Sequence, residues 1–306
     1  IIMPTITRFA PSPTGSLLLG GARTALFNFI YAKSVNGLFK IRIEDTDKSR
    51  NINDSINNIT SNLEWLGIRS DDQVYYQSKN VKKHIEIAND LVNKGFAYKC
   101  YHTENELEEL KKKHNRKIRS SWREKDKILK GNNKYCIRIK APLNGKTSIV
   151  DKIQGKVEIN NEELDDYVIL RKDLTPTFLL SSAIDDFLMN ITDIIRGDDH
   201  LTNSLRQKII FDFLNYSPSF AHMSLIHNER NEKLSKRDNS QSIEDYKTKG
   251  FFPESIINYL LRMGWSYGDK EIFSIKEAIK FFKIENLGKS PSKIDEKKLF
   301  YLNNYY

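Results

Sequence analysis

The sequence contains little cysteine and no long hydrophobic run, and both absences limit what this protein can be. Cys100 and Cys136 are the only cysteines among 306 residues, so the chain has no disulfide framework and suits a reducing compartment. No apolar run approaches the roughly 18 residues that a membrane-spanning helix needs. The opening Ile-Ile-Met-Pro lacks a basic segment followed by an apolar one, so we expect no N-terminal signal peptide. These features predict a cytoplasmic protein that does not bind to membranes.

Two widespread phosphate-binding motifs are also missing. Gly-x-Gly-x-x-Gly does not follow the first predicted strand, and Gly-x-x-x-x-Gly-Lys-Ser/Thr is absent, which argues against dinucleotide-binding and P-loop proteins. Positive charge, by contrast, is in excess, because 49 Lys and Arg oppose 40 Asp and Glu and leave a net charge of +9. This excess favours a polyanionic partner, although its sign alone does not separate nucleic acid from a membrane surface.

Part of the positive charge lies in the polar stretch from Lys111 to Lys130, which also contains Trp122. Two interpretations stay open for this stretch. It is either a solvated surface helix and loop, or a surface that contacts a phosphate backbone.

Hydrophobic periodicity predicts an α/β fold. Strands are expected at Thr5–Phe9 and Phe39–Ile43, and helices at Ile52–Leu66 and Val81–Lys94, an alternation typical of a parallel sheet. From Phe96 the pattern becomes rich in short strands, which indicates an inserted α+β module.

A second half of the nucleotide fold is expected after this module. Its predicted elements are a helix over Thr177–Met189, a strand over Thr192–Ile195, a helix over Leu201–Leu214 and a strand near His222–Ile226. Helices near Ile243–Lys249 and Pro253–Met263 follow.

The most informative segment runs from Arg8 through Pro-Ser-Pro-Thr-Gly to Gly20, Gly21 and Arg23. A predicted strand enters it and a predicted helix leaves it. Proline fixes φ and glycine has no Cβ, so the backbone can approach a ligand closely where the N–H groups at a helix start are unpaired. The segment therefore predicts a nucleotide site.

Together with a second cluster, Lys233-Leu234-Ser235-Lys236-Arg237, this segment resembles a known family. The two match the His-Ile-Gly-His region and the Lys-Met-Ser-Lys-Ser loop of class I aminoacyl-tRNA synthetases. The motifs between and after them follow the order of bacterial glutamyl-tRNA synthetases: Arg42 to Asp47, Tyr76-Gln77-Ser78, Ile195 to His200, and Gly264-Trp265-Ser266. The resemblance extends over nearly the whole chain, which would stop before the anticodon-binding region of the full-length enzymes.

The resemblance implies a role for each matching residue. The catalytic group would be Lys233, Ser235, Lys236 and Arg237, with Lys236 on the ATP phosphates. The other ATP-binding residues would be Pro11, Ser12, Pro13, Thr14, Gly15, Leu18, Gly20 and Gly21. The glutamate-binding residues would be Arg8, Ala10, Ser12, Glu44, Phe178, Ser182 and Arg196. A dicarboxylate with one ammonium group needs arginine forks and an acid, which Arg8, Arg196 and Glu44 supply.

Three of these positions depart from the family. Leu18 stands where the first His of the phosphate motif donates toward ATP, Phe178 replaces a tyrosine, and Ser182 replaces an asparagine. Leucine donates no hydrogen bond, and loss of one such donor lowers a rate by roughly 10²–10³. A weak or silent paralogue that only binds tRNA is therefore an alternative.

The family also implies a domain organisation. Residues 1–96 and 186–227 would form the two halves of a Rossmann-like catalytic domain, and residues 97–185 an inserted acceptor-stem-binding module. Residues 228–306 would hold the Lys-Leu-Ser-Lys-Arg loop and a helical stem-contact module.

The implied reaction joins glutamate to the 3′ end of tRNA-Glu through a glutamyl-adenylate, with ATP and Mg²⁺, in a monomeric enzyme. No metal bound by the protein itself is expected, because Cys100 and His102 lack a second pair of ligands. A second alternative is a short relative that glutamylates queuosine on tRNA-Asp.

Overall fold

The computed structural model of the chain describes residues 3–46, 52–113, 118–124, 134–228 and 242–306. The strands are β1 (Ile6–Phe9), β2 (Leu38–Ile43), β3 (Tyr75–Tyr76), β4 (Ala97–Cys100), β5 (Cys136–Ile139), β6 (Lys146–Asp151), β7 (Gly155–Asn160), β8 (Val168–Leu170), β9 (Asp193–Gly197), β10 (Ser219–Met223), β11 (Ile226–His227) and β12 (Ser292–Lys293). The α-helices are α1 (Leu19–Ser34), α2 (Ile52–Trp65), α3 (Val81–Asn93), α4 (Glu104–Lys113), α5 (Phe178–Leu188), α6 (Leu201–Phe213), α7 (Ile243–Thr248), α8 (Pro253–Arg262), α9 (Ile275–Phe281) and α10 (Glu296–Tyr305).

Parallel strands form the centre of the molecule. Strand β2 pairs with β1 and β3, and β10 pairs with β9, all in parallel. The backbone N–H of Thr192, just before β9, donates to the Ile6 carbonyl over 2.9 Å, so β1 and β9 lie side by side. Across the sheet the strands lie in the order β3, β2, β1, β9, β10. The chain order thus falls toward β1 and rises again from β9, and open α/β sheets bind ligands at such a switch point.

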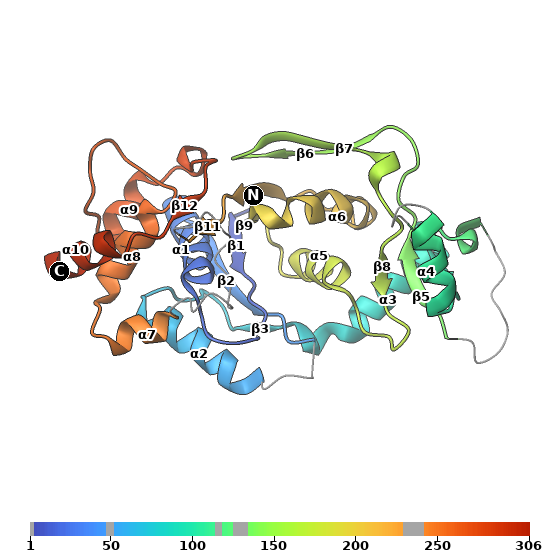
Figure 1. Ribbon diagram of the computed structural model, residues 1–306, viewed down its shortest axis with the longest axis horizontal. Helices are drawn as coiled ribbons and strands as arrows, with labels where there is room; N and C mark the ends of the chain where they lie inside the picture. Colours follow the sequence, from blue (N-terminus) through green and yellow to red (C-terminus); the bar gives the residue numbers. More distant parts are fainter. Residues whose placement is uncertain (1–2, 47–51, 114–117, 125–133, 229–241) are drawn as a thin grey trace.

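Two apolar layers cover this sheet, because the strands bury side chains on both faces. Phe9, Phe39 and Ile195 pack with α1 and α8 in one cluster, whereas Ile6 and Ile194 pack with α3, α5 and α6 in the other. Helices thus lie on both sides of the strands (Figure 1). The predicted α/β fold with a parallel sheet is confirmed.

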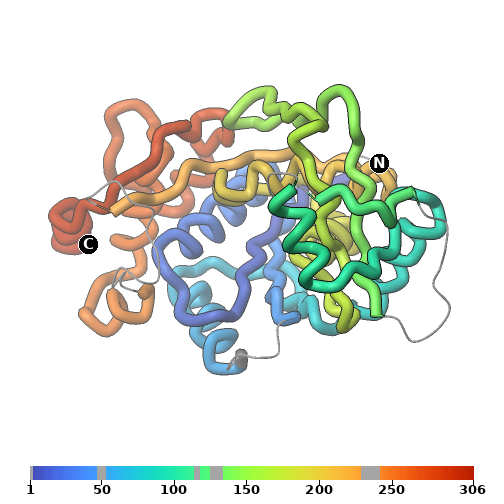
Figure 2. Tube along the Cα trace, turned by 45° about the vertical axis from the view of Figure 1, so that its right-hand side comes forward, coloured from blue at the N-terminus to red at the C-terminus, as the bar shows by residue number. Residues whose placement is uncertain are grey.

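The middle of the chain contributes to two different sheets. Strands β4, β5 and β8 form a small antiparallel sheet, which lies beside α4 at the end of the molecule away from α10 (Figures 1 and 2). The hairpin β6–β7 instead joins the central strands, because β6 pairs with β10 through Asp151 and Phe220. The proposed inserted module, residues 97–185, therefore includes a hairpin that is hydrogen-bonded to the second half of the sheet.

The predicted strand near His222–Ile226 begins earlier, at Ser219, and β10 ends at Met223. Pro218 has no N–H to donate to a strand ladder, so the pairing starts at the next residue, Ser219, which pairs with Asp193. The sequence prediction misses Ser219, Phe220 and Ala221 because these residues show no clear alternation of polar and apolar side chains.

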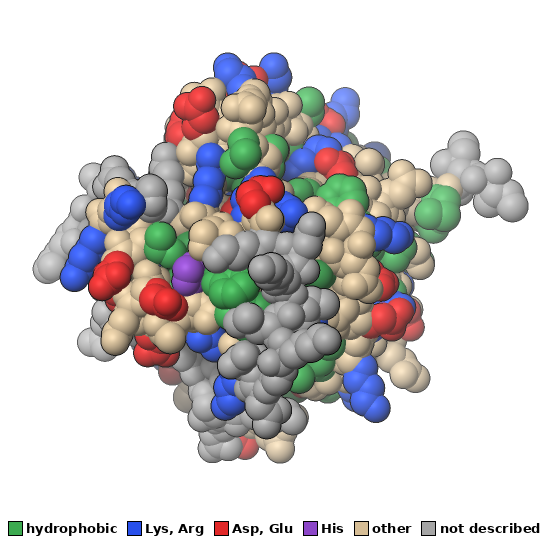
Figure 3. Space-filling view, turned by 90° about the vertical axis from the view of Figure 1, so that its right-hand side faces the viewer, with side chains coloured by type: hydrophobic (Ala, Val, Ile, Leu, Met, Phe, Trp, Pro, Cys, Tyr) green, Lys and Arg blue, Asp and Glu red, His purple; other side chains and the backbone are tan. Residues whose placement is uncertain are grey.

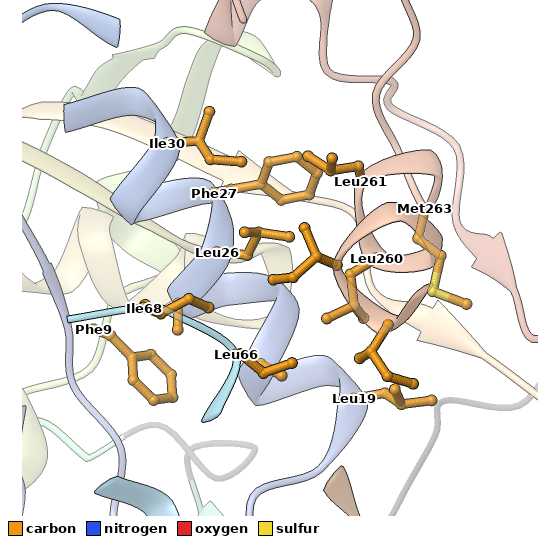
Figure 4. Close-up of a cluster of buried hydrophobic side chains, with 14 of the residues drawn as sticks. Phe9, Leu19, Leu26, Phe27, Ile30, Leu66, Ile68, Leu260, Leu261 and Met263 are labelled. Atoms are coloured by element: carbon orange, nitrogen blue, oxygen red, sulfur yellow. The ribbon is translucent and has the colours of Figure 1, made fainter. Parts of the chain in front are cut away.

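The C-terminal helices pack on α1. Leu26, Phe27 and Ile30 from α1 meet Leu260 and Leu261 from α8 in the buried cluster of Figure 4. Helices α7 and α9 each begin with a capping box, at Ser242 and Ser274, in which the serine side chain and an acidic side chain three residues later satisfy backbone N–H groups. Within the described ranges, no helix has the length and apolar character needed to cross a bilayer.

We predict that Gly37→Ala destabilises the contact between β1 and the end of α1. A Cβ on Gly37 would lie 2.3 Å from the Thr5 carbonyl oxygen, which is backbone and accepts from Leu38 N. The free energy of unfolding should fall by about 1–3 kcal/mol in urea denaturation. Gly20→Ala is the control, because nothing lies within 4 Å of a Cβ there. Equal losses in the two variants would contradict this packing.

Candidate functional site

A cavity of about 430 Å³ opens at the carboxyl ends of β1, β2 and β9, beside the start of α1. It brings together nine of the residues that the sequence predicts for the site, which come from segments far apart in the chain: Arg8, Ala10, Ser12, Leu18, Gly20, Gly21, Glu44, Phe178 and Arg196. The cavity lies at the point where the strand order reverses, as expected for a nucleotide fold.

A second cavity of about 920 Å³ adjoins the first and shares Ser12, Glu44 and Phe178 with it. Pro13 and Thr14 line this second cavity. The two spaces therefore meet at the Pro-Ser-Pro-Thr-Gly turn.

This turn is held in place by backbone hydrogen bonds. The Pro11 carbonyl accepts from Glu44 N over 2.9 Å, which ties the turn to the end of β2, and Thr14 N donates to the Ser12 carbonyl. Gly15 has φ of 144°, a conformation that residues with a Cβ rarely adopt. Pro11 and Gly15 thus shape the turn, and neither lines the two cavities.

The start of α1 faces the first cavity without a side-chain cap. Leu18 is the N-cap residue, its side chain makes no capping hydrogen bond, and no acidic residue follows in the first turn. Gly20 has open space where a Cβ would be. The N–H groups at this helix start have no partner within the helix, and with the positive end of the helix dipole they can meet an anion at this end of the cavity.

A single carboxylate holds two arginines beneath the cavity. Arg8 donates to Asp186 through Nε, at 2.8 Å, and through Nη2, at 3.1 Å. Arg42 Nη1 donates to the same carboxylate at 2.6 Å, and its Nη2 donates to Glu44 at 3.1 Å. Burial disfavours the ionised form of Asp186, but Arg42 and Arg8 outweigh it and lower the pKa of Asp186 to about 2. Burial raises the pKa of Glu44, and Arg42 opposes that shift.

Arg196 differs from Arg8 because its described partners are uncharged. Its Nη2 donates to Ser204 Oγ at 2.6 Å and Gln207 Oε1 at 3.0 Å, and its Nε donates to His222 Nε2 at 3.3 Å. Among the described residues no carboxylate lies within ion-pair distance of this guanidinium. Burial, with Arg8 nearby, lowers the pKa of Arg196 to about 9, so it is still a cation at neutral pH.

The two residues of α5 that the sequence resemblance assigns to glutamate binding lie at different depths. Phe178 lines both cavities and packs on His200, with ring centroids 5.2 Å apart. Ser182 lies one turn deeper and is only 1% exposed. Its Oγ donates to the Phe178 carbonyl and accepts from Gln207 Nε2, so it lines neither cavity.

The predicted catalytic residues Lys233, Ser235, Lys236 and Arg237 lie outside the described residues. The described residues on either side of that segment are both anchored. Ile226 and His227 in β11 pair with β12, and Ser242 forms a bridge with Leu18 at the start of α1.

Several site residues were missed by the sequence analysis. Asp186 and His222 are buried polar residues in segments that were assigned only as helix and strand, and an acidic pair in the apolar helix α5 was the signal for Asp186. Arg23 belongs to the segment that the sequence singles out, but without a role there. It lines the cavity and donates to the carbonyls of Ser224 and Met263, which joins α1 to the C-terminal helices.

No group of three or more His, Cys, Asp or Glu side chains that could hold a metal ion occurs within residues 3–46, 52–113, 118–124, 134–228 and 242–306. Cys100 and Cys136 lie opposite each other on β4 and β5 and are buried.

The basic stretch is partly structural. Arg123 pairs with Asp166, and Arg119 donates to the carbonyls of Asn161 and Leu164. Over the described part of the face in Figure 3, which looks onto this end of the molecule, basic and acidic side chains are interspersed.

Comparison with known proteins gives a consistent set of relatives. A family model described as tRNA synthetases class I (E and Q), catalytic domain, matches residues 5–301. Glutamate-tRNA ligase 2 of Ehrlichia chaffeensis is 50% identical over 307 residues, which cover 98% of this chain and 65% of the relative. Glutamate-tRNA ligase of Pelagibacter ubique is 46% identical, with 98% and 66% covered. The chain thus spans slightly less than two thirds of the length of these relatives.

Among solved structures, a glutamate tRNA ligase from Elizabethkingia meningosepticum in complex with its amino acid superimposes with a TM-score of 0.90 at 31% identity. The match covers 99% of this chain and 70% of that one.

We predict that Asp186→Asn lowers the free energy of unfolding by about 3–5 kcal/mol, because it leaves two buried guanidiniums without their shared charge. Urea denaturation measures this loss. Asp72→Asn is the matched control, since the Asp72 side chain is 61% exposed where it pairs with Lys40, and its loss should lower the free energy of unfolding far less than Asp186→Asn does. Similar losses in both variants would contradict the role of Asp186.

The same carboxylate predicts an acid dependence. Its pKa is depressed to about 2, so its stabilisation is complete above the ordinary Asp pKa near 4 and is lost as the pH falls toward 2. The difference in unfolding free energy between the wild type and Asp186→Asn should therefore shrink between pH 4 and pH 2. A difference that stays constant over this range would contradict the assignment.

Proposed function

The chain belongs to the class I tRNA synthetase family (E and Q), and from this we propose that it joins glutamate to the 3′ end of tRNA-Glu through a glutamyl-adenylate. The observation that carries the proposal is the cavity in which Arg196, Arg8 and Glu44 lie beside the uncapped start of α1. One end of this cavity suits an amino acid with two carboxylates, and the other suits a phosphate.

Arg196 is the proposed partner of the glutamate side-chain carboxylate. A buried cation surrounded by neutral hydrogen-bond acceptors is stabilised by an anionic ligand, and a neutral amide would leave its charge unpaired. This difference favours glutamate over glutamine. Arg8 is already neutralised by Asp186. We assign Arg8 to the α-carboxylate, because a weaker ion pair leaves that group free to react.

Glu44 is the proposed partner of the substrate ammonium group. Its side chain is 7% exposed, and its Oε1 accepts from Arg42, which keeps the carboxylate oriented at the border of the two cavities. With the ammonium on Glu44 and the side chain on Arg196, the α-carboxylate of glutamate would face the start of α1.

ATP would place its α-phosphate at that helix start, where Gly20 lets a ligand approach the backbone. The α-carboxylate attacks the α-phosphorus, and the bond to pyrophosphate breaks. Lys233, Lys236 and Arg237 are the proposed cations that meet the charge on the phosphates. Mg²⁺ would accompany ATP and neutralise its phosphate oxygens, which are the ligands it prefers.

The second cavity is the proposed binding site of the terminal adenosine of tRNA. It opens onto Glu44 and Phe178, so a ribose hydroxyl there would reach the activated carbonyl and displace AMP. The net charge of +9 is consistent with an RNA partner. We further propose a cytoplasmic, monomeric enzyme.

Glutamate-dependent exchange between ATP and labelled pyrophosphate tests this function on the 306-residue chain, with and without tRNA-Glu. We expect exchange with glutamate and far less with glutamine, and stimulation by tRNA. No exchange above background at saturating tRNA would contradict the proposal and favour a silent tRNA-binding protein.

Leu18→His should raise the exchange rate by about tenfold or more, because the imidazole adds a donor at the uncapped helix start. Leu18→Ala is the control, since it removes the same side chain without adding a donor and should not raise the rate. An unchanged rate in Leu18→His would mean that another group already supplies this hydrogen bond.

A further inference from the structure

We propose that Asp151 and His222 are positioning residues that fix how Arg196 presents its guanidinium to the carboxylate of the substrate. The inference rests on the proposed function of the cavity. The three residues lie on adjacent parallel strands: Asp151 ends β6, His222 is in β10, and Arg196 is in β9. His222 is the register partner of Arg196, and Phe220, two residues earlier in β10, is the register partner of Asp151.

Asp151 fixes the tautomer of His222. Its Oδ2 lies 2.6 Å from His222 Nδ1 and accepts from His222 N at 3.0 Å, while its Oδ1 accepts from Ile153 N and Gln154 N. A carboxylate that accepts backbone N–H groups is ionised, so the proton between it and the imidazole belongs on Nδ1. His222 Nε2 then carries a lone pair.

The opposite side of the imidazole requires the same tautomer. Arg196 Nε always carries a proton and lies 3.3 Å from His222 Nε2, which must accept it. Ser204 Oγ lies 2.9 Å from the same nitrogen and also accepts from Arg196 Nη2. The serine hydroxyl therefore accepts from Arg196 and donates to His222 Nε2, whose single lone pair is shared between Ser204 and Arg196.

This arrangement holds Arg196 in a fixed plane without cancelling its charge. Nε and Nη2 are directed to His222, Ser204 and Gln207, all neutral. Burial lowers the pKa of His222, which keeps the ring uncharged. In the described part of the chain Nη1 has no protein partner, so it is the nitrogen left for a ligand in the cavity that Arg196 lines.

A role in folding alone would have a different signature. Asp151 also ties the hairpin β6–β7 to β10, so its loss lowers stability in either case. If it positions Arg196, its loss must in addition weaken binding of glutamate more than binding of ATP, because ATP lies at the other end of the cavity.

The test compares Asp151→Asn with the wild type in pyrophosphate exchange with tRNA-Glu present. An asparagine amide can donate to His222 Nδ1 and shift the proton to Nε2, which then opposes the N–H of Arg196. We expect the KM for glutamate to rise by about tenfold or more, with kcat and the KM for ATP changed by less than about threefold. Asp193→Asn is the matched control, because Asp193 is a buried carboxylate of the same sheet that pairs with Lys152 and does not line the cavity.

A second variant, His222→Gln, tests whether Asp151 acts on Arg196 through the imidazole of His222. In His222→Gln the amide oxygen can accept from Arg196 whatever residue 151 is, so adding Asp151→Asn to it should change the KM for glutamate by less than about threefold. Effects that simply add in the double variant would overturn the inference. So would an unchanged KM for glutamate in Asp151→Asn, or an equal rise in the KM for ATP.

The ¹⁵N chemical shifts of the His222 ring test the inference without activity. We expect a protonated Nδ1 and an unprotonated Nε2 in the wild type, and the reverse in Asp151→Asn. Protonation on Nε2 in the wild type would overturn the inference. Absence of exchange in the wild type would contradict the proposed function instead.

Discussion

The shared carboxylate of Asp186 is the interaction on which the site depends. It accepts hydrogen bonds from Arg8 on β1 and Arg42 on β2, two strands that are paired with each other, and it reaches them from α5 on one face of the sheet. Two guanidiniums packed without it would repel each other in a medium that screens charge weakly. The carboxylate therefore allows the ends of β1 and β2 to carry arginine and Glu44 into one small cavity.

The arginines of the site differ in whether an acidic side chain neutralises them, and this difference determines where an anion binds in the cavity. Arg8 and Arg42 are neutralised by acids, whereas Arg196 is held by a serine, a glutamine and an imidazole. An anion therefore gains most at Arg196. A second anion is favoured at the start of α1, where no acidic side chain occupies the first turn. These two positions suit a substrate whose carboxylate binds at Arg196 and which reacts with a phosphate group bound at the start of α1.

Much of the fold follows from local sequence. The alternation of strands and helices, the turn after β1 and the glycines at the start of α1 are encoded by periodicity, proline and glycine, so they could be predicted. Asp186 and His222 could not, because their partners lie up to 178 residues away and only the packed sheet brings them together. Ser182 was expected at the substrate, yet it lies one helical turn below Phe178, bonded to Gln207. That expectation came from the family resemblance, and the helical pattern of α5 does not tell how deep a residue lies below the cavity.

The central claim is that the charge of Arg196 selects the side-chain carboxylate of the amino acid. The most direct measurement is a crystal structure of this chain with a non-hydrolysable glutamyl-adenylate analogue. We predict the side-chain carboxylate within hydrogen-bond distance of Arg196, the ammonium beside Glu44 and the phosphate at the start of α1. An analogue bound with its side-chain carboxylate on another residue, or with Arg196 still paired only to Ser204, Gln207 and His222, would contradict the account.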